Sequence, residues 1–254
     1  MATDFEVTAY PEILAGGYSH DDVRMEYVVR VNTLLKSDMT VLDFGAGRGK
    51  WRDDPVAFRR WMGDFRGRCA KVVACDVDPA VLDNPQVDER VLWDHHKPLP
   101  FPDASFDLIS AFSVLEHVED AEATAAELKR ILKPGGWLCA WTPNKWGYVG
   151  IGARLIPTRL HDWVLHIVEP KRTEGDSFVP LYRMNTKSTL QRLFPPDSYL
   201  HCTYGFDGQP FYHAQWAPLF HFWRFLFWLL PPQMKGFYMV FIQKRDTTKQ
   251  ADGQ

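Results

Sequence analysis

Cysteine is scarce in this sequence, and its spacing offers no paired site. Four cysteines occur in 254 residues, and none belongs to a Cys-x-x-Cys pair. Cys75 and Cys139 fall within apolar runs that predict buried strands, where a reduced thiol is the usual state. The pattern argues against a disulfide-stapled secreted fold and favours a reducing compartment.

The chain also lacks a large excess of charge of either sign. Its 29 lysines and arginines nearly balance 32 acidic residues, which leaves a net charge of -3. No general electrostatic attraction toward nucleic acid follows from these totals, and no separate basic module is visible. We therefore expect no nucleic-acid partner, although a local basic patch is compatible with the same totals.

No internal repeat, low-complexity tract or secretory leader is visible. The first ten residues carry Asp4 and Glu6 and lack the basic and apolar regions of a signal peptide. Apolar residues make up 46% and charged residues 24% of the chain, as in ordinary globular proteins. We expect a cytoplasmic protein with one sizeable core.

Short apolar runs alternate with helical patterns along the first 143 residues. Strands are expected at residues 40–44, 71–75, 90–93, 106–112 and 137–141, and helices at 20–37, 55–66 and 120–132, with the first helix capped by Ser19 to Asp22. Wholly apolar strands separated by helices indicate a parallel sheet that is covered on both faces. The sequence therefore predicts an α/β fold.

The remainder of the chain is less regular. A helix at 185–194 and strands at 199–204 and 236–244 are expected after an irregular stretch. We predict a single domain over residues 1–254, with an N-terminal helix at 20–37 and cap insertions at about 143–184 and 206–235. Insertions at such places build active-site covers in α/β proteins.

A glycine loop follows the first expected strand, with the sequence Val41-Leu-Asp-Phe-Gly-Ala-Gly-Arg-Gly-Lys50. A dinucleotide-binding loop would require glycine where the chain has Lys50. A phosphate-binding loop of the G-x-x-x-x-G-K-[ST] type would require other residues at Phe44 and Trp51. Both interpretations fail on residues that their chemistry needs.

Further motifs follow the loop in a fixed order. They are the strand-ending Asp76, Leu99–Asp107, Leu115–Val118 and Leu132–Gly136. Together with Asp43-x-Gly45-x-Gly47-x-Gly49, this set resembles the type 11, small-molecule branch of class I S-adenosylmethionine-dependent methyltransferases, over about residues 20–143. The resemblance implies a Rossmann-like, doubly wound, seven-stranded and mostly parallel sheet whose last strand is antiparallel, with S-adenosylmethionine as cofactor.

The resemblance also implies the cofactor-binding residues. They are Asp43, Phe44, Gly45, Ala46, Gly47 and Gly49 in the loop at the methionine part, Asp76 at the ribose with Val77 next to it, Asp94 at the adenine and Ser113 at the sulfonium. A bidentate carboxylate suits the two ribose hydroxyls, which favours Asp76 over Asp78. Two structural alternatives stay open: Asp43 bonding the amides of its own loop, and Asp76 serving only a strand-end turn.

Methyl transfer needs a general base only when a hydroxyl acceptor must lose its proton. His117 is the first candidate, with Glu116, His161 and Tyr182 behind it. No metal site is expected, because the adjacent His95 and His96 would diverge in a strand.

Residues 211–230 hold 15 apolar residues, with one helical face made of Trp216, Leu219, Phe220, Trp223, Phe227 and Leu230. Pro218, His221 and Arg224 interrupt a membrane span. A cap helix lining an apolar pocket and an interfacial helix giving peripheral membrane contact both remain open. The oligomeric state is also open.

These features predict a methyltransferase for a small, apolar or amphipathic, lipid-like acceptor. Asn144, Trp146 and Tyr148 are expected pocket walls, and residues 169–176 are either a lid or a solvated loop. The alternative is a catalytically inactive, membrane-associated binding or scaffolding protein of the same fold. The complete glycine loop with Asp76 favours the enzyme.

Overall fold

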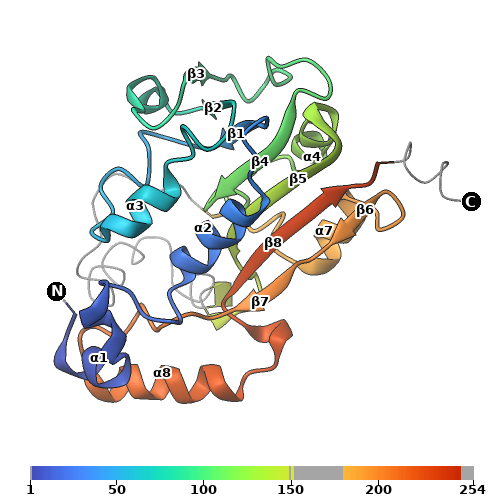
Figure 1. Cartoon of the computed structure of the whole chain (residues 1–254). Coiled ribbons are helices and arrows are strands. Elements are labelled where there is room, and N and C mark those ends of the chain that lie inside the picture. The colour runs from blue at the N-terminus through green and yellow to red at the C-terminus, as the bar shows by residue number, and fades with distance from the viewer. Residues whose placement is uncertain (1, 149, 152–179, 247–254) are drawn as a thin grey trace, which may run out of the picture.

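The strands of this protein form one mixed sheet, in the order β3-β2-β1-β4-β5-β8-β6 with β7 beside β8 (Figure 1). The computed structural model describes residues 2–148, 150–151 and 180–246. The strands are β1 (Thr40–Phe44), β2 (Lys71–Asp76), β3 (Glu89–Leu92), β4 (Phe106–Phe112), β5 (Leu132–Pro143), β6 (Tyr199–His201), β7 (Tyr204–Phe206) and β8 (Phe237–Lys244).

The first five strands are parallel, since β1 pairs with β2 and β4, β2 with β3, and β4 with β5. β8 then runs antiparallel to β5, with Leu138 opposite Ile242. β6 and β7 follow one continuous register along β8, from Tyr199 opposite Lys244 to Phe206 opposite Phe237. They therefore fill a single position, and the expected seven-stranded arrangement with an antiparallel last strand is confirmed.

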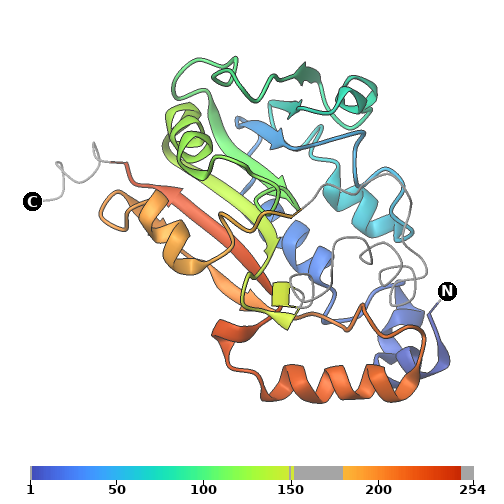
Figure 2. The ribbon, with the colours of Figure 1, turned by 180° about the vertical axis from the view of Figure 1, so that it is seen from behind.

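Helices cover both faces of this sheet, as Figure 2 shows from behind. The helices are α1 (Asp4–Ala9), α2 (Val23–Leu34), α3 (Ala57–Gly63), α4 (Ala121–Ile131), α7 (Lys187–Leu193) and α8 (Ala217–Leu229), with short 3-10 helices η1 (Pro11–Ala15), η2 (Pro79–Asp83) and η3 (Pro232–Met234). Neighbouring residues of β1 serve the two faces in turn: Val41 packs with residues of α2, and Leu42 packs with residues of α4. The doubly wound α/β prediction is thereby confirmed.

The start of α2 differs from the expected capping box. Asp22 is the N-cap, and its side chain accepts hydrogen bonds from the backbone amides of Arg24 and Met25. Ser19 instead donates its hydroxyl to Gln209 Oε1 at 2.8 Å. The helix spans residues 23–34 rather than 20–37, because a contact with the distant cap segment holds the chain before Asp22.

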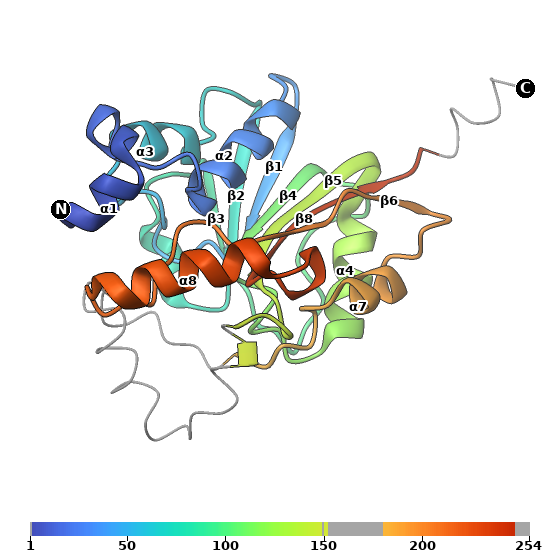
Figure 3. The same cartoon turned by 90° about the horizontal axis from the view of Figure 1, so that it is seen from below.

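α8 lies along the outside of the molecule, on the side toward which β4 and β5 point (Figures 1 and 3). Its buried Phe220 packs on Phe5 and Tyr10 of the N-terminal segment, with ring centroids 5.1 and 6.2 Å apart. Pro218 falls in the first turn, where proline is tolerated. The expected lid at 169–176 and most of the first insertion lie outside the described residues.

Candidate functional site

The glycine loop adopts backbone angles that side chains disfavour. Gly45, Gly47 and Gly49 have φ angles of 71°, 49° and 92°. A Cβ on Gly45 would lie 2.4 Å from Cγ2 of Val114, so the loop touches the segment that follows β4. This close approach brings the carboxyl ends of β1 and β4 together and fixes the loop between them.

Asn84 holds the same loop from the other side, a role that no sequence motif indicated. Its side chain is fully buried and donates to the carbonyl oxygen of Gly47 at 3.2 Å. A Cβ on Gly49 would lie 2.7 Å from the Asn84 oxygen. The residue lies 37 positions beyond Gly47, so only the fold makes it a neighbour.

Asp76 ends β2 with its carboxylate toward the loop. One oxygen, Oδ2, accepts from the amide of Gly47 at 2.6 Å, and Oδ1 accepts from the amide of Asp78 at 2.9 Å. The nearest atom to a Cβ placed on Gly47 would be this carboxylate, at 4.0 Å. The space in front of the Asp76 carboxylate is therefore open. Each oxygen keeps a further lone pair for a ligand. The turn role and a ligand role are thus compatible.

Asp43 lies close enough to Asp76 for the two charges to interact. Burial, and then the negative charge of Asp76, raises the pKa of the Asp43 carboxyl to about 7. Among the described residues, no loop amide donates to this carboxylate, so the alternative of a purely local loop bond is not what the structure shows. The pair creates a negative potential beside the glycine loop.

Ser113 begins the turn after β4 in a strained conformation, with a φ angle of 61°. Its amide donates to the carbonyl oxygen of Trp141 at 2.9 Å, which ties the ends of β4 and β5 together. Of the remaining loop candidates, Phe44 and Ala46 are buried, and Val77 is exposed at the surface after Asp76. The structure therefore gathers these residues at one edge of the sheet.

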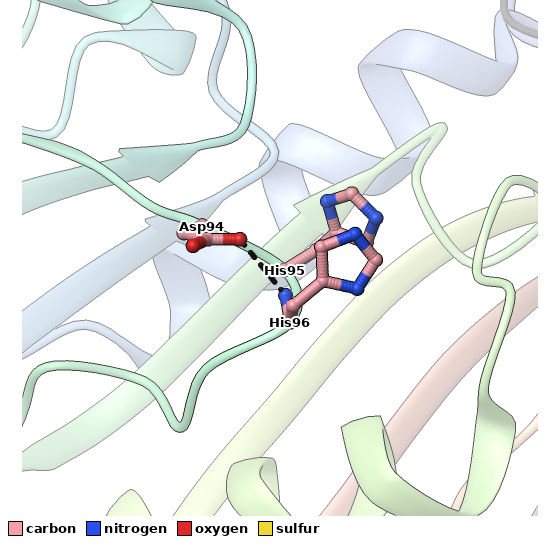
Figure 4. Close-up of side chains that lie close together, drawn as sticks. All are labelled: Asp94, His95 and His96. Atoms are coloured by element: carbon pink, nitrogen blue, oxygen red, sulfur yellow. Dashed lines mark hydrogen bonds between the residues drawn. The ribbon is translucent and has the colours of Figure 1, made fainter.

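Asp94 lies two residues beyond Leu92, the register partner of Asp76, and thus at the same edge. The amide of His96 and then the ammonium of Lys97 lower the pKa of its carboxyl. The rings of His95 and His96 lie 3.9 Å apart, and with Asp94 they form an exposed group that could hold a metal ion (Figure 4). The expectation that these histidines diverge was wrong, because they lie in a turn after β3 rather than within a strand.

His117 lies on the turn that begins at Ser113, with Nε2 3.9 Å from Glu116 Oε1 and a side chain that is 28% exposed. Glu116 itself is buried and accepts from Thr142 Oγ1 at 2.8 Å, while its backbone carbonyl accepts from the amides of Leu181 and Tyr182. These bonds fix the His117 turn to β5. Glu116 and the buried Tyr182 are thus structural neighbours, and His161 lies outside the described residues.

The expected pocket walls have different environments. Asn144 is fully buried and donates to the carbonyls of Gln233 and Lys235, so it clamps the exit of β5 rather than lining a cavity. Trp146 is exposed, and Tyr148 packs on Trp223 and on the buried Phe227 of α8. Aromatic contacts therefore hold the segment just after β5 against α8.

A row of rings crosses the ends of three strands. Trp141 of β5 stacks between Phe112 of β4 and Phe237 of β8, with both centroid distances 4.7 Å. The ammonium of Lys50 lies 4.6 Å above the Phe112 ring. Trp141 Nε1 is buried without a hydrogen-bond partner among the described residues. The row was not singled out from the sequence, since its members come from separate strands.

Comparison with known proteins agrees with this geometry. Residues 42–140 match a family model described as "Methyltransferase domain". The match covers less than half of the chain, and it shows that this central part is similar to S-adenosylmethionine-dependent methyltransferase domains. S-adenosylmethionine is the cofactor of this family, as the motif order implied.

The curated relatives are similar to the central part of this chain. A ubiquinone/menaquinone biosynthesis C-methyltransferase of Hahella chejuensis is 33% identical over 116 residues, which cover 41% of this chain and 43% of the relative. A "Probable S-adenosylmethionine-dependent methyltransferase" of Mycolicibacterium smegmatis is 36% identical over 110 residues, covering 41% and 38%. The chain thus spans about two fifths of the length of these relatives.

A solved structure shows the same fold over a larger part of the chain. The geranyl diphosphate C-methyltransferase of Streptomyces coelicolor superposes with a TM-score of 0.51 at 15% identity. The match covers 87% of this chain and 76% of that protein. At this identity the likeness concerns the fold alone.

Proposed function

We propose that this protein transfers a methyl group from S-adenosylmethionine to a small, apolar or amphipathic acceptor. The observation that supports this most is the glycine loop with Asp43 and Asp76 beside it, within the residues that match the methyltransferase domain model. The Gly47 position leaves space in front of the Asp76 carboxylate, which is what a bound diol would need. The residues present therefore fit the cofactor.

Each side chain in this proposal has one physical task. S-adenosylmethionine, when bound, supplies a methyl group on a positively charged sulfur. Asp43 and Asp76 provide negative potential that favours a cationic ligand. Asp76 accepts from the ribose hydroxyls, Asp94 accepts from the adenine amino group, and the strained Ser113 turn fixes the edge where the acceptor must approach in line.

The apolar character of the acceptor is inferred from the aromatic row. Phe112, Trp141 and Phe237 offer stacked rings at the ends of β4, β5 and β8, and Trp141 adds one buried N–H donor. Phe112 and Phe237 are buried and support Trp141, which is only partly buried, so the Trp141 ring is the part of the row that an apolar acceptor can reach. The names of the quinone-pathway relative and the geranyl diphosphate enzyme point to acceptors of this kind.

His117 is the base that we propose for a hydroxyl acceptor. His117→Gln should then lower kcat about 10²- to 10⁴-fold on hydroxyl acceptors and leave an amine acceptor unaffected. A loss of equal size on every acceptor would instead assign His117 a structural role. The rates are measured at saturating cofactor, with circular dichroism as the check on folding.

We further propose that α8 gives the protein peripheral contact with a lipid surface. Trp228 is 79% exposed, and Trp216, Phe225 and Leu229 are each at least 60% exposed, although all are large and apolar. No acidic residue occurs from Gly208 to Arg245, and Arg224 lies on α8 itself. An acid-free, tryptophan-bearing face suits an anionic bilayer surface. No helix among the described residues is long and apolar enough to span a membrane.

Vesicle flotation tests the lipid contact. Wild-type protein should float with phosphatidylcholine vesicles that contain phosphatidylglycerol, and the double variant Phe225→Ser/Trp228→Ser should float at least about tenfold less, because each lost ring removes apolar burial. Leu82→Ser changes another exposed apolar residue, on η2, and should have no effect. Equal flotation of all three proteins would contradict the lipid contact.

Transfer of a tritiated methyl group tests the activity. The donor is incubated with the protein and with phenolic, isoprenoid and fatty-acid acceptors, and label is counted in the organic phase. Label above a no-enzyme control is expected for at least one class. Cofactor binding without transfer to any class would favour the inactive scaffold.

A further inference from the structure

A cavity that adjoins the glycine loop at Arg52 and Gln86, and extends away from it along α3, has arginines at four of its ten lining residues. It has a volume of about 630 Å³ and lies between α3, the turn that follows it and the loop after η2. Its lining includes the four guanidinium groups of Arg52, Arg60, Arg66 and Arg68 and one carboxylate, that of Asp64. A net-positive cavity in a protein of net charge -3 is not explained by methyl transfer.

Two of these arginines are fixed by neutral acceptors. Arg68 donates to the side-chain oxygen of Asn32 and to the carbonyls of Trp61 and Asp64, and its guanidinium stacks 4.7 Å from the Trp61 ring. Arg60 donates to the carbonyl of Asp54 at 2.5 Å. Because carbonyl and amide oxygens are neutral, these bonds orient the two guanidinium groups without cancelling their charge.

The other two arginines stay at the rim. Arg66 pairs with Asp64 and Arg52 with Asp53, and both arginine side chains are more than 40% exposed. Exposed pairs of this kind contribute little free energy, and each guanidinium keeps further N–H donors. Both can therefore turn toward an anion in the cavity.

The second cavity of the described residues provides a comparison. It has about 460 Å³ and contains three basic side chains, Lys145, Arg183 and Arg192, beside three acidic ones, Glu119, Asp120 and Glu122. Positive and negative groups thus balance there, whereas positive groups dominate in the arginine cavity. The second cavity therefore does not share the excess of positive charge of the arginine cavity.

We propose that the arginine cavity binds a small phosphorylated molecule. Guanidinium groups match phosphate oxygens with paired N–H donors, and a group of them can surround a doubly charged anion. The volume falls within the range of small-ligand pockets. A nucleic acid would require a basic surface that tracks its backbone, whereas these cations converge on one concavity. The proposal is independent of the methyl-transfer assignment.

Titration with inorganic pyrophosphate tests the proposal. Isothermal titration calorimetry of the full chain should show saturable binding at one site. The double variant Arg52→Gln/Arg66→Gln should weaken this binding at least about tenfold, because it removes two charge-assisted donors. Arg68 is left unchanged, since its three bonds hold the turn. An unaltered melting temperature shows that the variant is folded.

The control is Arg192→Gln in the charge-balanced second cavity, which should leave pyrophosphate affinity unchanged. Absent or non-saturable binding, or an equal loss in the control, would overturn the proposal. A single-stranded RNA that binds more tightly than pyrophosphate, with the same dependence on Arg52 and Arg66, would also overturn it in favour of a nucleic-acid surface.

Discussion

At the scale of single residues, the raised pKa of Asp43 links stability to ligand binding. The carboxyl has a pKa of about 7 in the folded protein, against an ordinary aspartate pKa of 3.8 in the unfolded chain. The native state therefore binds more protons than the unfolded state between these values, and stability falls as the pH rises from about 4 to about 7. This loss of stability on ionisation of Asp43 is expected if the charged Asp43 and Asp76 pair binds a cationic ligand.

Asp43→Asn should accordingly stabilise the ligand-free protein by about 1–3 kcal/mol at pH 8, with the gain vanishing near pH 4. The same variant should bind S-adenosylmethionine more weakly, because a negative charge is lost. Urea unfolding at both pH values is the measurement, with the exposed Asp83→Asn as control. A destabilised variant at pH 8 would show that the Asp43 charge supports the fold instead.

A comparison of Gly45 and Gly67 distinguishes the stability cost of backbone strain from the cost of steric crowding. Their φ angles are 71° and 73°, but a Cβ would meet Val114 at 2.4 Å in the first case and nothing within 4 Å in the second. Gly67→Ala should cost about 1–2 kcal/mol through strain alone. Gly45→Ala should cost about 1–3 kcal/mol more, because overpacking is added. Denaturant midpoints measure both, and equal losses would contradict the described contact.

At the scale of elements, α8 divides into a structural and an exposed face. Phe220 is fully buried against the N-terminal segment, whereas Phe225 is 60% exposed. Phe220→Ala should cost about 3–5 kcal/mol of stability, and Phe225→Ala less than about 0.5 kcal/mol. Thermal unfolding distinguishes them, and a similar loss for both would show that the exposed face is covered in solution.

The strands illustrate what periodicity can and cannot predict. β1 and β4 were predicted with their observed ends, because strands buried on both faces are continuous apolar runs. The division of the sixth strand into β6 and β7, and the start of α2 at Val23 behind the N-cap Asp22, were not predicted. Both depend on contacts with distant segments, such as the bond from Ser19 to Gln209.

At the scale of the whole molecule, the sequence predicted a cofactor site at the glycine loop but not the residues that pack around this loop. Asp43, Asp76 and the glycines follow strand ends in a recognisable order, so their meeting at one edge could be expected. Asn84, which holds Gly47, and Trp141, in the aromatic row, carry no local signal because only the fold makes them neighbours. The arginine cavity likewise joins α3 to the loop after η2.

The most direct test of the proposed function is calorimetric titration of S-adenosylmethionine and S-adenosylhomocysteine into the wild-type protein, Asp76→Ala and Asp78→Ala. Asp78 is the matched control, because it caps η2 and is not assigned to the diol. We predict micromolar binding that Asp76→Ala weakens by about 1.5–3 kcal/mol and Asp78→Ala leaves nearly unchanged. Failure of the wild-type protein to bind either compound would contradict the account.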